Sequence, residues 1–472
     1  MSPTAWGTGM WSCDVERCDK PSVRTDGACI LCNRHLCATH VDDPYHKCPN
    51  WEDAELWCPA ASEAEKREVT TLFNKIIVTA LLSRASHLRK GVPCSLAKDL
   101  KYDPSTRGSV MGGQNIHVEI QFEDGILWLA RIRRVNAMSP PLDLRRYILL
   151  SEAATLQFLS SETKIPVPRI FDYQFDEGNP IGVGYIIYEK IPGKPLNWPS
   201  ATTEQKHKII DQLADIYIEL RSRPFDLLGS LDQPGTSHIG PLAGETHTDY
   251  KADGQMRPLG PFTNLNDFLR ASIEFTLDLI RRGERYASRP IDAFLIHRFL
   301  LDSIPALIRQ IQPRGTNSNS QLHSKCYLTH ADSKGDHVLT DPNHAIAAMI
   351  DWEWAHTAPA SLAFNSPVML LPVADFYDGV TQIGEDEEFF AQVLQDKGHP
   401  DLAEIVRKGR VLHFFVFCCG YPGDWEGYLG LFGGLRRALD SGGDGELEWE
   451  AWREKMLIVY KEDAILRELM AR

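Results

Sequence analysis

The sequence predicts an α+β protein in which a small cysteine- and histidine-rich domain precedes a β-rich lobe and a larger helical lobe. Three observations support this expectation. Six of the eleven cysteines lie between Cys13 and Cys48, alternating apolar and polar residues fill the centre of the chain, and Asp332 and Asp351 each follow a short apolar run. At roughly 150 residues per domain, the 472 residues suffice for about three domains.

Composition and charge exclude several classes of protein. Hydrophobic residues make up 43% of the chain and charged residues 24%, which is typical of a globular protein and argues against disorder. A protein with a formal net charge of −14 lacks the broad basic field that non-specific binding to nucleic acid requires. We recognise no secretory signal and no apolar run of about 20 residues. We therefore expect a cytoplasmic protein, without excluding the nucleus, and neither a membrane nor a nucleic-acid partner.

The N-terminal segment carries eight metal-ligand side chains in a short stretch. They come in the order Cys13, Cys18, Cys29, Cys32, Cys37, His40, His46 and Cys48. Eight such ligands divide into two tetrahedral zinc sites, and the residues between them are too polar to form an apolar core. The alternative is a disulfide-stabilised head, although histidine has no part in disulfides. We expect His35, which lies outside this pattern, to face solvent.

This spacing resembles that of the AN1-type zinc finger over residues 13–48, with Leu36 where that family usually has phenylalanine. The resemblance implies two interleaved structural zinc sites. It assigns Cys13, Cys18, Cys37 and His40 to one ion, and Cys29, Cys32, His46 and Cys48 to the other. We expect a zinc finger over residues 1–58 that serves protein interaction.

Residues 59–104 are expected to connect this finger to the rest of the chain. Residues 51–64 are acidic and contain proline, which is typical of a linker. From Glu65 to about Lys90 apolar residues recur at helical spacing, and Gly91 is a suitable helix stop. The apolar face of this helix would bind a partner or, more commonly, pack on the domain that follows.

The next segment predicts the strands of a small lobe over residues 105–195. Residues 116–122 alternate between apolar and polar side chains, and Glu123-Asp124-Gly125 is a hairpin turn signal. A second strand over residues 126–132 carries Arg131. Just before the first strand, Gly112 and Gly113 would let backbone N–H groups approach phosphate, although such a pair is usually only a turn.

A helix and a third strand complete the small lobe. Helical periodicity from about Leu144 to Leu159 includes Glu152, and a short apolar strand runs from Tyr185 towards Ile191-Pro192-Gly193. A hairpin followed by a helix and further strands is the outline of the small lobe of a kinase-like fold. The remaining residues, 196–472, would form the larger helical lobe.

Two loop aspartates of the large lobe are candidates for phosphoryl transfer. Asp332 lies within His330-Ala331-Asp332, and Asp351 within Ile350-Asp351-Trp352. Phosphoryl transfer needs a carboxylate beside the acceptor hydroxyl and carboxylates that hold Mg²⁺ on the phosphates. Two neighbouring loops can supply both kinds of carboxylate. Taken singly, either motif could equally be an ordinary loop aspartate, with His330 a structural histidine.

The order of these motifs resembles the aminoglycoside phosphotransferase family across about residues 105–440. The resemblance implies a bilobal protein-kinase-like fold that binds ATP and Mg²⁺ in the cleft between the lobes. It implies Asp332 as the catalytic base, Asp351 as the main Mg²⁺ ligand, and Arg131 with Glu152 as a phosphate-positioning ion pair. The implied site residues are His330, Asp332 and Lys334 for catalysis, Gly112, Gly113, Arg131, Glu152, Glu189 and Ile191 for the nucleotide, and Asp351 and His337 for Mg²⁺.

Two residues depart from the family pattern. His337 stands where the family has an asparagine that binds the metal, and Mg²⁺ prefers oxygen ligands. The neighbouring Asp336 could take its place. Arg131 stands where the family usually has lysine. This replacement keeps the positive charge but changes the shape of the side chain. Lys334, two residues after Asp332, stands where protein kinases often carry a lysine that faces the transferred phosphate.

The residues after Asp351 indicate what kind of acceptor the protein uses. After Asp351 there is no room for a long activation segment and no Ala-Pro-Glu motif, so a small hydroxyl compound is expected as the acceptor. The net acidic charge would weakly favour a cationic one. We thus expect an ATP-dependent phosphotransferase with a zinc-finger appendage for a protein partner. The alternative is an inactive pseudokinase scaffold or a nucleotide-sensing protein.

Overall fold

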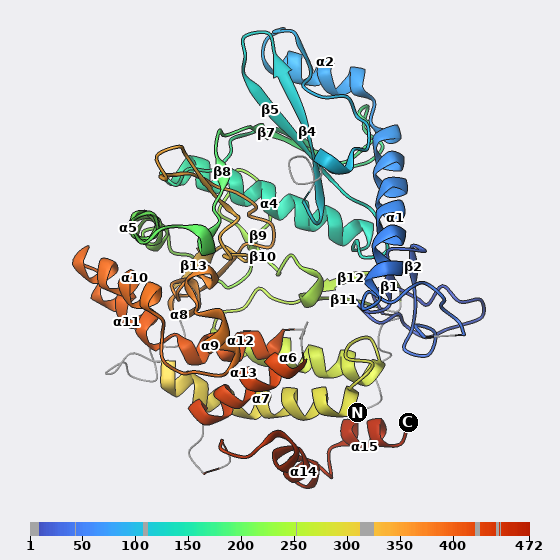
Figure 1. Cartoon of the computed structure of the whole chain (residues 1–472), viewed down its shortest axis with the longest axis vertical. Helices are drawn as coiled ribbons and strands as arrows, with labels where there is room; N and C mark the ends of the chain where they lie inside the picture. Colours follow the sequence, from blue (N-terminus) through green and yellow to red (C-terminus); the bar gives the residue numbers. More distant parts are fainter. Residues whose placement is uncertain are drawn as a thin grey trace.

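A five-stranded antiparallel sheet forms the small lobe, in the strand order β3-β4-β5-β7-β6 (Figure 1). Its strands are β3 (Cys94–Leu96), β4 (Asn115–Phe122), β5 (Leu127–Arg133), β6 (Ile170–Gln174) and β7 (Tyr185–Glu189). The computed structural model describes residues 9–42, 44–106, 112–251, 253–311, 325–420, 425–439, 443 and 445–472. In these ranges no helix is long and apolar enough to cross a membrane.

The two faces of this sheet have different neighbours because strand side chains alternate. Ile116, Val118 and Ile120 of β4 are buried against α1 (Ala54–Lys75) and α2 (Val78–Leu88). On the opposite face, Ile186 of β7 packs on α4 (Leu142–Glu162). The alternation that predicted a half-buried strand over residues 116–122 is thereby confirmed.

The connecting segment is more helical than expected. The linker expected over residues 51–64 is wrong, because α1 begins at Ala54 with the Asp53 side chain accepting from the backbone N–H of Leu56. The expected boundary after residue 58 therefore falls inside α1. Val69 and Leu72 of α1 are buried in the small-lobe core, so this helix packs on the domain that follows.

The N-terminal domain contains the short hairpin of β1 (Ala28–Cys29) and β2 (Arg34–His35), and it lies beside the first turns of α1 (Figure 1). It also contacts the large lobe. Arg24 donates to Glu284 at 3.0 Å and to the carbonyl of Thr248 at 2.8 Å. The expectation that His35 faces solvent is wrong: its ring stacks on Trp11 and lies 2.7 Å from the carbonyl of Ala137.

The large lobe is mostly helical and, in the described residues, holds four small antiparallel sheets, two of which carry the aspartate loops near the centre of the molecule (Figure 1). Of these two sheets, one pairs β13 (Cys326–Thr329) with β16 (His356–Pro359), and the other has the order β15-β14-β8. The remaining strands are β8 (Lys194–Pro195), β9 (Ser230–Leu231), β10 (Ile239–Gly240), β11 (Thr248–Tyr250), β12 (Met256–Pro258), β14 (Val338–Thr340) and β15 (Ile346–Met349).

The helices of the large lobe form two apolar cores. One core joins α5, α10 and α11 to the two sheets that carry the aspartate loops, and the other is built by α6, α7 and the C-terminal helices α12 to α15. Their bounds are α5 (Thr203–Arg221), α6 (Leu265–Arg282), α7 (Pro290–Ile311), α8 (Ala360–Ala363), α9 (Val373–Tyr377), α10 (Glu385–Asp396), α11 (Pro400–Lys408), α12 (Arg410–Cys419), α13 (Trp425–Leu439), α14 (Trp449–Val459) and α15 (Ala464–Met470).

Hydrogen bonds hold the two aspartate loops side by side. Asp332 lies in the loop from β13 to β14, and Asp351 in the loop from β15 to β16. Thr329 pairs with His356 in the first sheet, and Val338 pairs with Met349 in the second. These registers bring both loops to the same region.

Candidate functional site

A buried network of ion pairs joins the small lobe to the loop after β15. Arg131 of β5 pairs with Glu152 of α4 and with Glu353, which lies 2.8 Å away. Arg131 also donates to Asp351 at 2.9 Å, and Arg133 pairs with Glu353. Arg131 and Arg133 lie on one face of the sheet because they are two residues apart on a strand. The structure thus brings the expected pair Arg131 and Glu152 together.

Glu353 belongs to this network although the sequence motifs did not single it out. Its side chain is 1% exposed, and it also accepts from the amide of Asn115 in β4 at 3.2 Å. Burial lowers the pKa of Arg133 to about 10, which the negative charge of Glu245 partly opposes. A glutamate between Trp352 and Trp354 carried a usable signal, because a charge buried among aromatic residues requires a partner.

The loop between β13 and β14 positions Asp332. The backbone N–H of Asp332 donates to Nδ1 of His330 at 3.1 Å, and Nε2 of His330 lies 2.9 Å from the carbonyl oxygen of Ile350. Burial lowers the pKa of His330, so the neutral ring accepts at Nδ1 and donates from Nε2. His330 therefore ties the two aspartate loops together. Lys334 lies 2.8 Å from the Asp332 carboxylate.

Asp351 has a backbone conformation that few side chains adopt. Its φ is 60°, in the left-handed region that aspartate tolerates better than most residues. Its side chain is 51% exposed, and Oδ1 accepts from Arg131. A half-exposed carboxylate held at one oxygen can offer the other to a cation.

His337, the other expected Mg²⁺ ligand, is buried. Its Nδ1 accepts from the backbone N–H of Gly335 at 3.3 Å, and its ring centre lies 4.3 Å from that of His330. Burial lowers the pKa of His337 to about 2. Asp336 is exposed and lies 3.9 Å from Lys334. In the part of the chain that the structure describes, no hydrogen bond or ion pair joins either residue to Asp351.

Of the other residues expected to contact the nucleotide, Gly112 and Gly113 precede β4, and Glu189 and Ile191 lie at and just after the end of β7. The backbone N–H of Gly112 donates to the carbonyl of Asn115 at 2.9 Å, and a side chain added at Gly113 would meet no atom within 4 Å. After β7, the N–H groups of Glu189 and Lys190 bond to other backbone carbonyls. The N–H of Ile191 makes no hydrogen bond within the described residues, so it can donate to a ligand.

A cavity of about 420 Å³ opens beside Asp332. Its walls come from α5 and α12, from the loop that carries Asp332, and from residues 362–368. The oxygen of an acceptor bound there can meet the Asp332 carboxylate. The arrangement therefore places the Asp332 carboxylate at a cavity and the Asp351 carboxylate beside Arg131.

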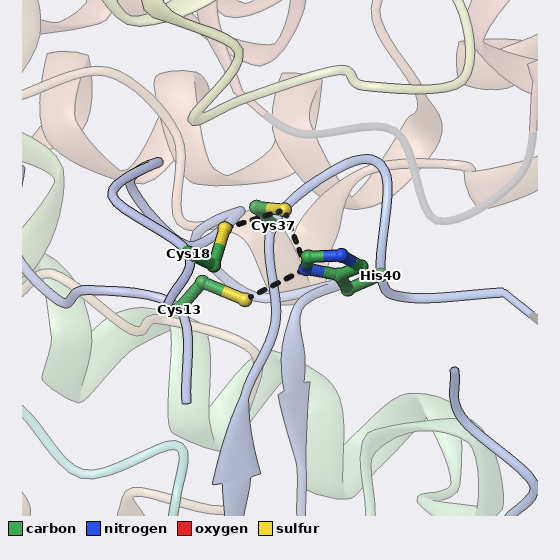
Figure 2. A group of neighbouring side chains, drawn as sticks. All are labelled: Cys13, Cys18, Cys37 and His40. Carbon is green, nitrogen blue, oxygen red and sulfur yellow. Dashed lines mark hydrogen bonds between the residues drawn. The ribbon is translucent and has the colours of Figure 1, made fainter. Parts of the chain in front are cut away.

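The cysteines and histidines of the N-terminal domain form two groups. Figure 2 shows one of them, in which the side chains of Cys13, Cys18, Cys37 and His40 converge. The other contains Cys29, Cys32, His46 and Cys48. Within each group all ligand atoms lie within 4.8 Å of one another. The structure thus groups the eight residues as the sequence resemblance implied.

The distances in these groups suit a tetrahedral metal ion. Sγ of Cys13 lies 3.3 Å from Nδ1 of His40, and Sγ of Cys18 lies 3.9 Å from Sγ of Cys37. Zn–S bonds near 2.3 Å place tetrahedral ligand atoms about 3.8 Å apart. In the second group, Nδ1 of His46 lies 3.1 Å from the carbonyl of Val41. That contact leaves Nε2 of His46 for the metal.

Comparisons with known proteins give a family and distant relatives. The profile of the phosphotransferase enzyme family matches residues 133–398. A subtelomeric hrmA-associated cluster protein of Aspergillus fumigatus is 32% identical over 132 residues, which cover 28% of this chain. The match spans 25% of that protein, about a quarter of its length.

Two further proteins match over longer stretches. Clavilactone A biosynthesis cluster protein Y of Ampulloclitocybe clavipes is 24% identical over 271 residues, which cover 54% of this chain and 62% of that protein. Among solved structures, the GDP complex of wild-type aminoglycoside 2'-phosphotransferase-IIIa is 20% identical with a TM-score of 0.38. That alignment covers 75% of this chain and 90% of the other.

Proposed function

Because the chain belongs to the phosphotransferase enzyme family, we propose that it transfers the γ-phosphate of ATP to a hydroxyl group of a small molecule. The observation that carries this proposal is the pair of loops joined through His330. One loop places Asp332 at a cavity, and the other places Asp351 beside Arg131.

The proposed reaction uses Asp332 as the base. The acceptor oxygen attacks the γ-phosphorus, a new O–P bond forms, and the bond from phosphorus to the bridging oxygen of ADP breaks. Asp332 receives the hydroxyl proton. Lys334, which lies 2.8 Å from Asp332, adds positive charge near the transferred group. ADP and the phosphorylated alcohol are the products.

The nucleotide would lie between the lobes. We assign the phosphates to Arg131 and to the backbone at Gly112 and Gly113, with Glu152 orienting Arg131. The adenine would meet the backbone from Glu189 to Ile191. When bound, Mg²⁺ neutralises phosphate charge.

Asp351 fits Mg²⁺ because a carboxylate is a ligand that this ion prefers. Its side chain is half exposed and already lies beside the phosphate-binding Arg131. His337 fits less well, since it is buried, offers nitrogen and already accepts a hydrogen bond at Nδ1.

We further propose that the N-terminal domain, which precedes α1, is an AN1-type zinc finger with two structural Zn²⁺ ions. The two groups of ligands support this proposal. Elemental analysis of the full chain should give two zinc ions. One zinc per chain would contradict the two-site assignment. A protein partner could use the exposed Tyr45, Trp51 and Leu56 near this domain.

One observation favours a second candidate function, an inactive nucleotide-binding scaffold. Arg131 already meets three carboxylates, those of Glu152, Asp351 and Glu353. An arginine so engaged has fewer N–H groups for phosphate. If the network does not rearrange around the nucleotide, the protein would bind ATP weakly or without turnover.

Substitution of the two aspartates tests the proposed roles. In the full chain, Asp351→Ala should abolish Mg²⁺-dependent binding of a non-hydrolysable ATP analogue, measured by calorimetry. Asp332→Ala should leave that binding largely intact and abolish phosphoryl transfer to an acceptor. Equal losses of nucleotide affinity in both variants would contradict the assignment.

The metal dependence tests His337. If this histidine binds the second metal, His337→Asn should raise turnover most at low Mg²⁺, and Mn²⁺ should support the unchanged protein better than Mg²⁺ does. If Asp336 is the ligand instead, Asp336→Ala should reduce turnover and His337→Asn should have no effect. Assays of both variants with each metal separate the two assignments.

A further inference from the structure

The cavity beside Asp332 has strongly apolar walls. α5 contributes Leu213, Ile216 and Leu220, and α12 contributes Val416 and Phe417. Its volume of about 420 Å³ is near the lower end of the usual range for ligand pockets, about 300–1,000 Å³. A ligand that fills such a space is compact and presents mostly apolar surface.

The charges of the cavity neutralise each other. Among the described residues that line it, the charged side chains are Asp332 and Lys334, which form an ion pair at 2.8 Å. Nδ1 of His330 and Nδ1 of His337 each accept from a backbone N–H, and burial lowers the pKa of His356 and His413, so none of these lining rings adds a positive charge near pH 7. A cationic ligand would meet Lys334 and find no carboxylate apart from the base itself. An anionic ligand would be repelled by Asp332.

His413 of α12 offers one unused polar atom. Its Nδ1 is buried and has no hydrogen-bond partner within the described residues. Burial lowers the pKa of His413 to about 3, so its ring is neutral near pH 7. In the tautomer that carries the proton on Nε2, Nδ1 keeps its lone pair. A buried acceptor of this kind gains from a ligand that donates a hydrogen bond.

We propose that this cavity is the acceptor site and that its substrate is an uncharged alcohol with a compact apolar body. One hydroxyl meets Asp332, and a second donor group on the substrate satisfies Nδ1 of His413. The proposal rests on the proposed function and specifies its substrate class. It differs from the cationic acceptor that the net charge of −14 weakly favours, because that charge is spread over the chain whereas the cavity contains one carboxylate.

Two alcohols that differ by one charge test the substrate class. 1-Phenyl-1,2-ethanediol is uncharged and has two hydroxyl groups, and 2-phenylglycinol is the same alcohol with an ammonium group in place of the secondary hydroxyl. Binding of each to the full chain, with Mg²⁺ and a non-hydrolysable ATP analogue present, is measured by saturation-transfer NMR. We expect the uncharged alcohol to bind at least about tenfold more tightly, because both compounds can donate to Nδ1 of His413 but the ammonium group loses more solvation and finds, among the described lining residues, no carboxylate apart from that of Asp332. We also expect the chain to phosphorylate the uncharged alcohol with ATP. Kanamycin, a polycation, is the comparison compound, and we expect no phosphorylation of it.

A variant at the cavity wall should change this preference. Val416 is 40% exposed, so Val416→Asp can add a carboxylate to the cavity without burying it fully. We expect the variant to improve the relative affinity of 2-phenylglycinol at least about tenfold. Ile458→Asp is the control, because Ile458 is 69% exposed on α14 and does not line the cavity. Thermal melting verifies that both variants are folded.

The outcomes separate the substrate class from the proposed function. If the chain binds the nucleotide but prefers 2-phenylglycinol or kanamycin, or if Val416→Asp leaves the preference unchanged, the substrate class is wrong and the phosphotransferase proposal stands. If 1-phenyl-1,2-ethanediol binds as expected but no phosphate is transferred and no nucleotide binds, the phosphotransferase proposal fails and the cavity remains a site for uncharged ligands. If neither alcohol binds to the chain, the inference about the substrate class is overturned.

Discussion

At the scale of single residues, Glu353 makes the contacts on which the site depends most. It is a buried carboxylate that accepts from Arg131, Arg133 and Asn115, all on strands of the small lobe. Removing one partner from a buried ion pair leaves the other charge uncompensated, which is strongly destabilising. Glu353 thus fixes the two arginines and joins the small lobe to the Asp351 loop.

Glu353→Gln should therefore lower the free energy of unfolding by about 3 to 5 kcal/mol. The measurement is urea denaturation of the full chain. Glu63→Gln is the control, because Glu63 is exposed on α1 and lies 3.9 Å from Lys66 at the surface. It should change stability by less than about 0.5 kcal/mol. Equal stability of the two variants would contradict the role given to Glu353.

His297 illustrates how a single buried residue shapes pH dependence. It is fully buried in α7, and burial lowers its pKa to about 4. Between the ordinary value near 6.5 and this one, the unfolded chain binds a proton that the folded chain does not. Its contribution to stability is therefore complete above about pH 6.5 and is lost as the pH falls towards 4.

His297→Gln should remove this loss. Between about pH 7 and pH 5, the unchanged protein should lose about 2 kcal/mol more stability than the variant does. Urea denaturation at both pH values, with the same zinc concentration throughout, measures the difference. The same loss in both proteins would show that His297 is not neutral in the folded state.

At the scale of elements, the N-terminal domain is fastened to the large lobe. Arg24 is buried between Glu284 and the backbone carbonyls of Glu245 and Thr248. Met10 packs in an apolar cluster with Leu144 of α4. This domain therefore contacts the helix that carries Glu152, so loss of its structure should also loosen α4.

Arg24→Ala should release the N-terminal domain. The loss of charged hydrogen bonds should weaken its docking by at least about 2 kcal/mol, seen as faster hydrogen exchange over residues 9–42. Zinc content should stay the same. Arg17→Ala is the control, because the Arg17 side chain is 90% exposed. Unchanged exchange in Arg24→Ala would contradict the docking role.

The helix α2 stabilises the small lobe by covering its sheet. Leu81 is fully buried against the strands, so Leu81→Ala should cost about 2 to 5 kcal/mol through lost burial and a residual cavity. Leu56 of α1 is exposed, and Leu56→Ala should change stability by less than about 0.5 kcal/mol. Urea denaturation of both variants measures their free energies of unfolding. A small effect at Leu81 would mean that α2 can detach without cost.

At the scale of the whole molecule, local sequence patterns predicted the structural features that depend on residues close together in the sequence. Alternation over residues 116–122 gave β4, and helical periodicity near Glu152 gave α4. The resemblance to the AN1-type zinc finger implied which cysteines and histidines gather in each group. These features depend on strand and helix periods or on short loops, so a single sequence is enough to find them.

Long-range contacts could not be predicted in the same way. Glu353 meets Arg131 across 222 residues, and Arg24 meets Glu284 across 260 residues. No periodicity relates such positions, because they become neighbours only when the lobes pack. The helical start at Ala54 was missed for a different reason: the acidic, proline-containing sequence suggested a linker, but Asp53 caps the helix.

The most direct test of the central claim is transfer of labelled γ-phosphate from ATP. The full chain is incubated with Mg²⁺, labelled ATP and 1-phenyl-1,2-ethanediol, and the products are separated. We predict a labelled phosphate ester that forms with the unchanged protein and with Ile458→Asp, and that is absent with Asp332→Ala although this variant still binds the nucleotide. Label that passes to the alcohol equally well in Asp332→Ala, or nucleotide binding with no transfer to any alcohol tested, would contradict the account.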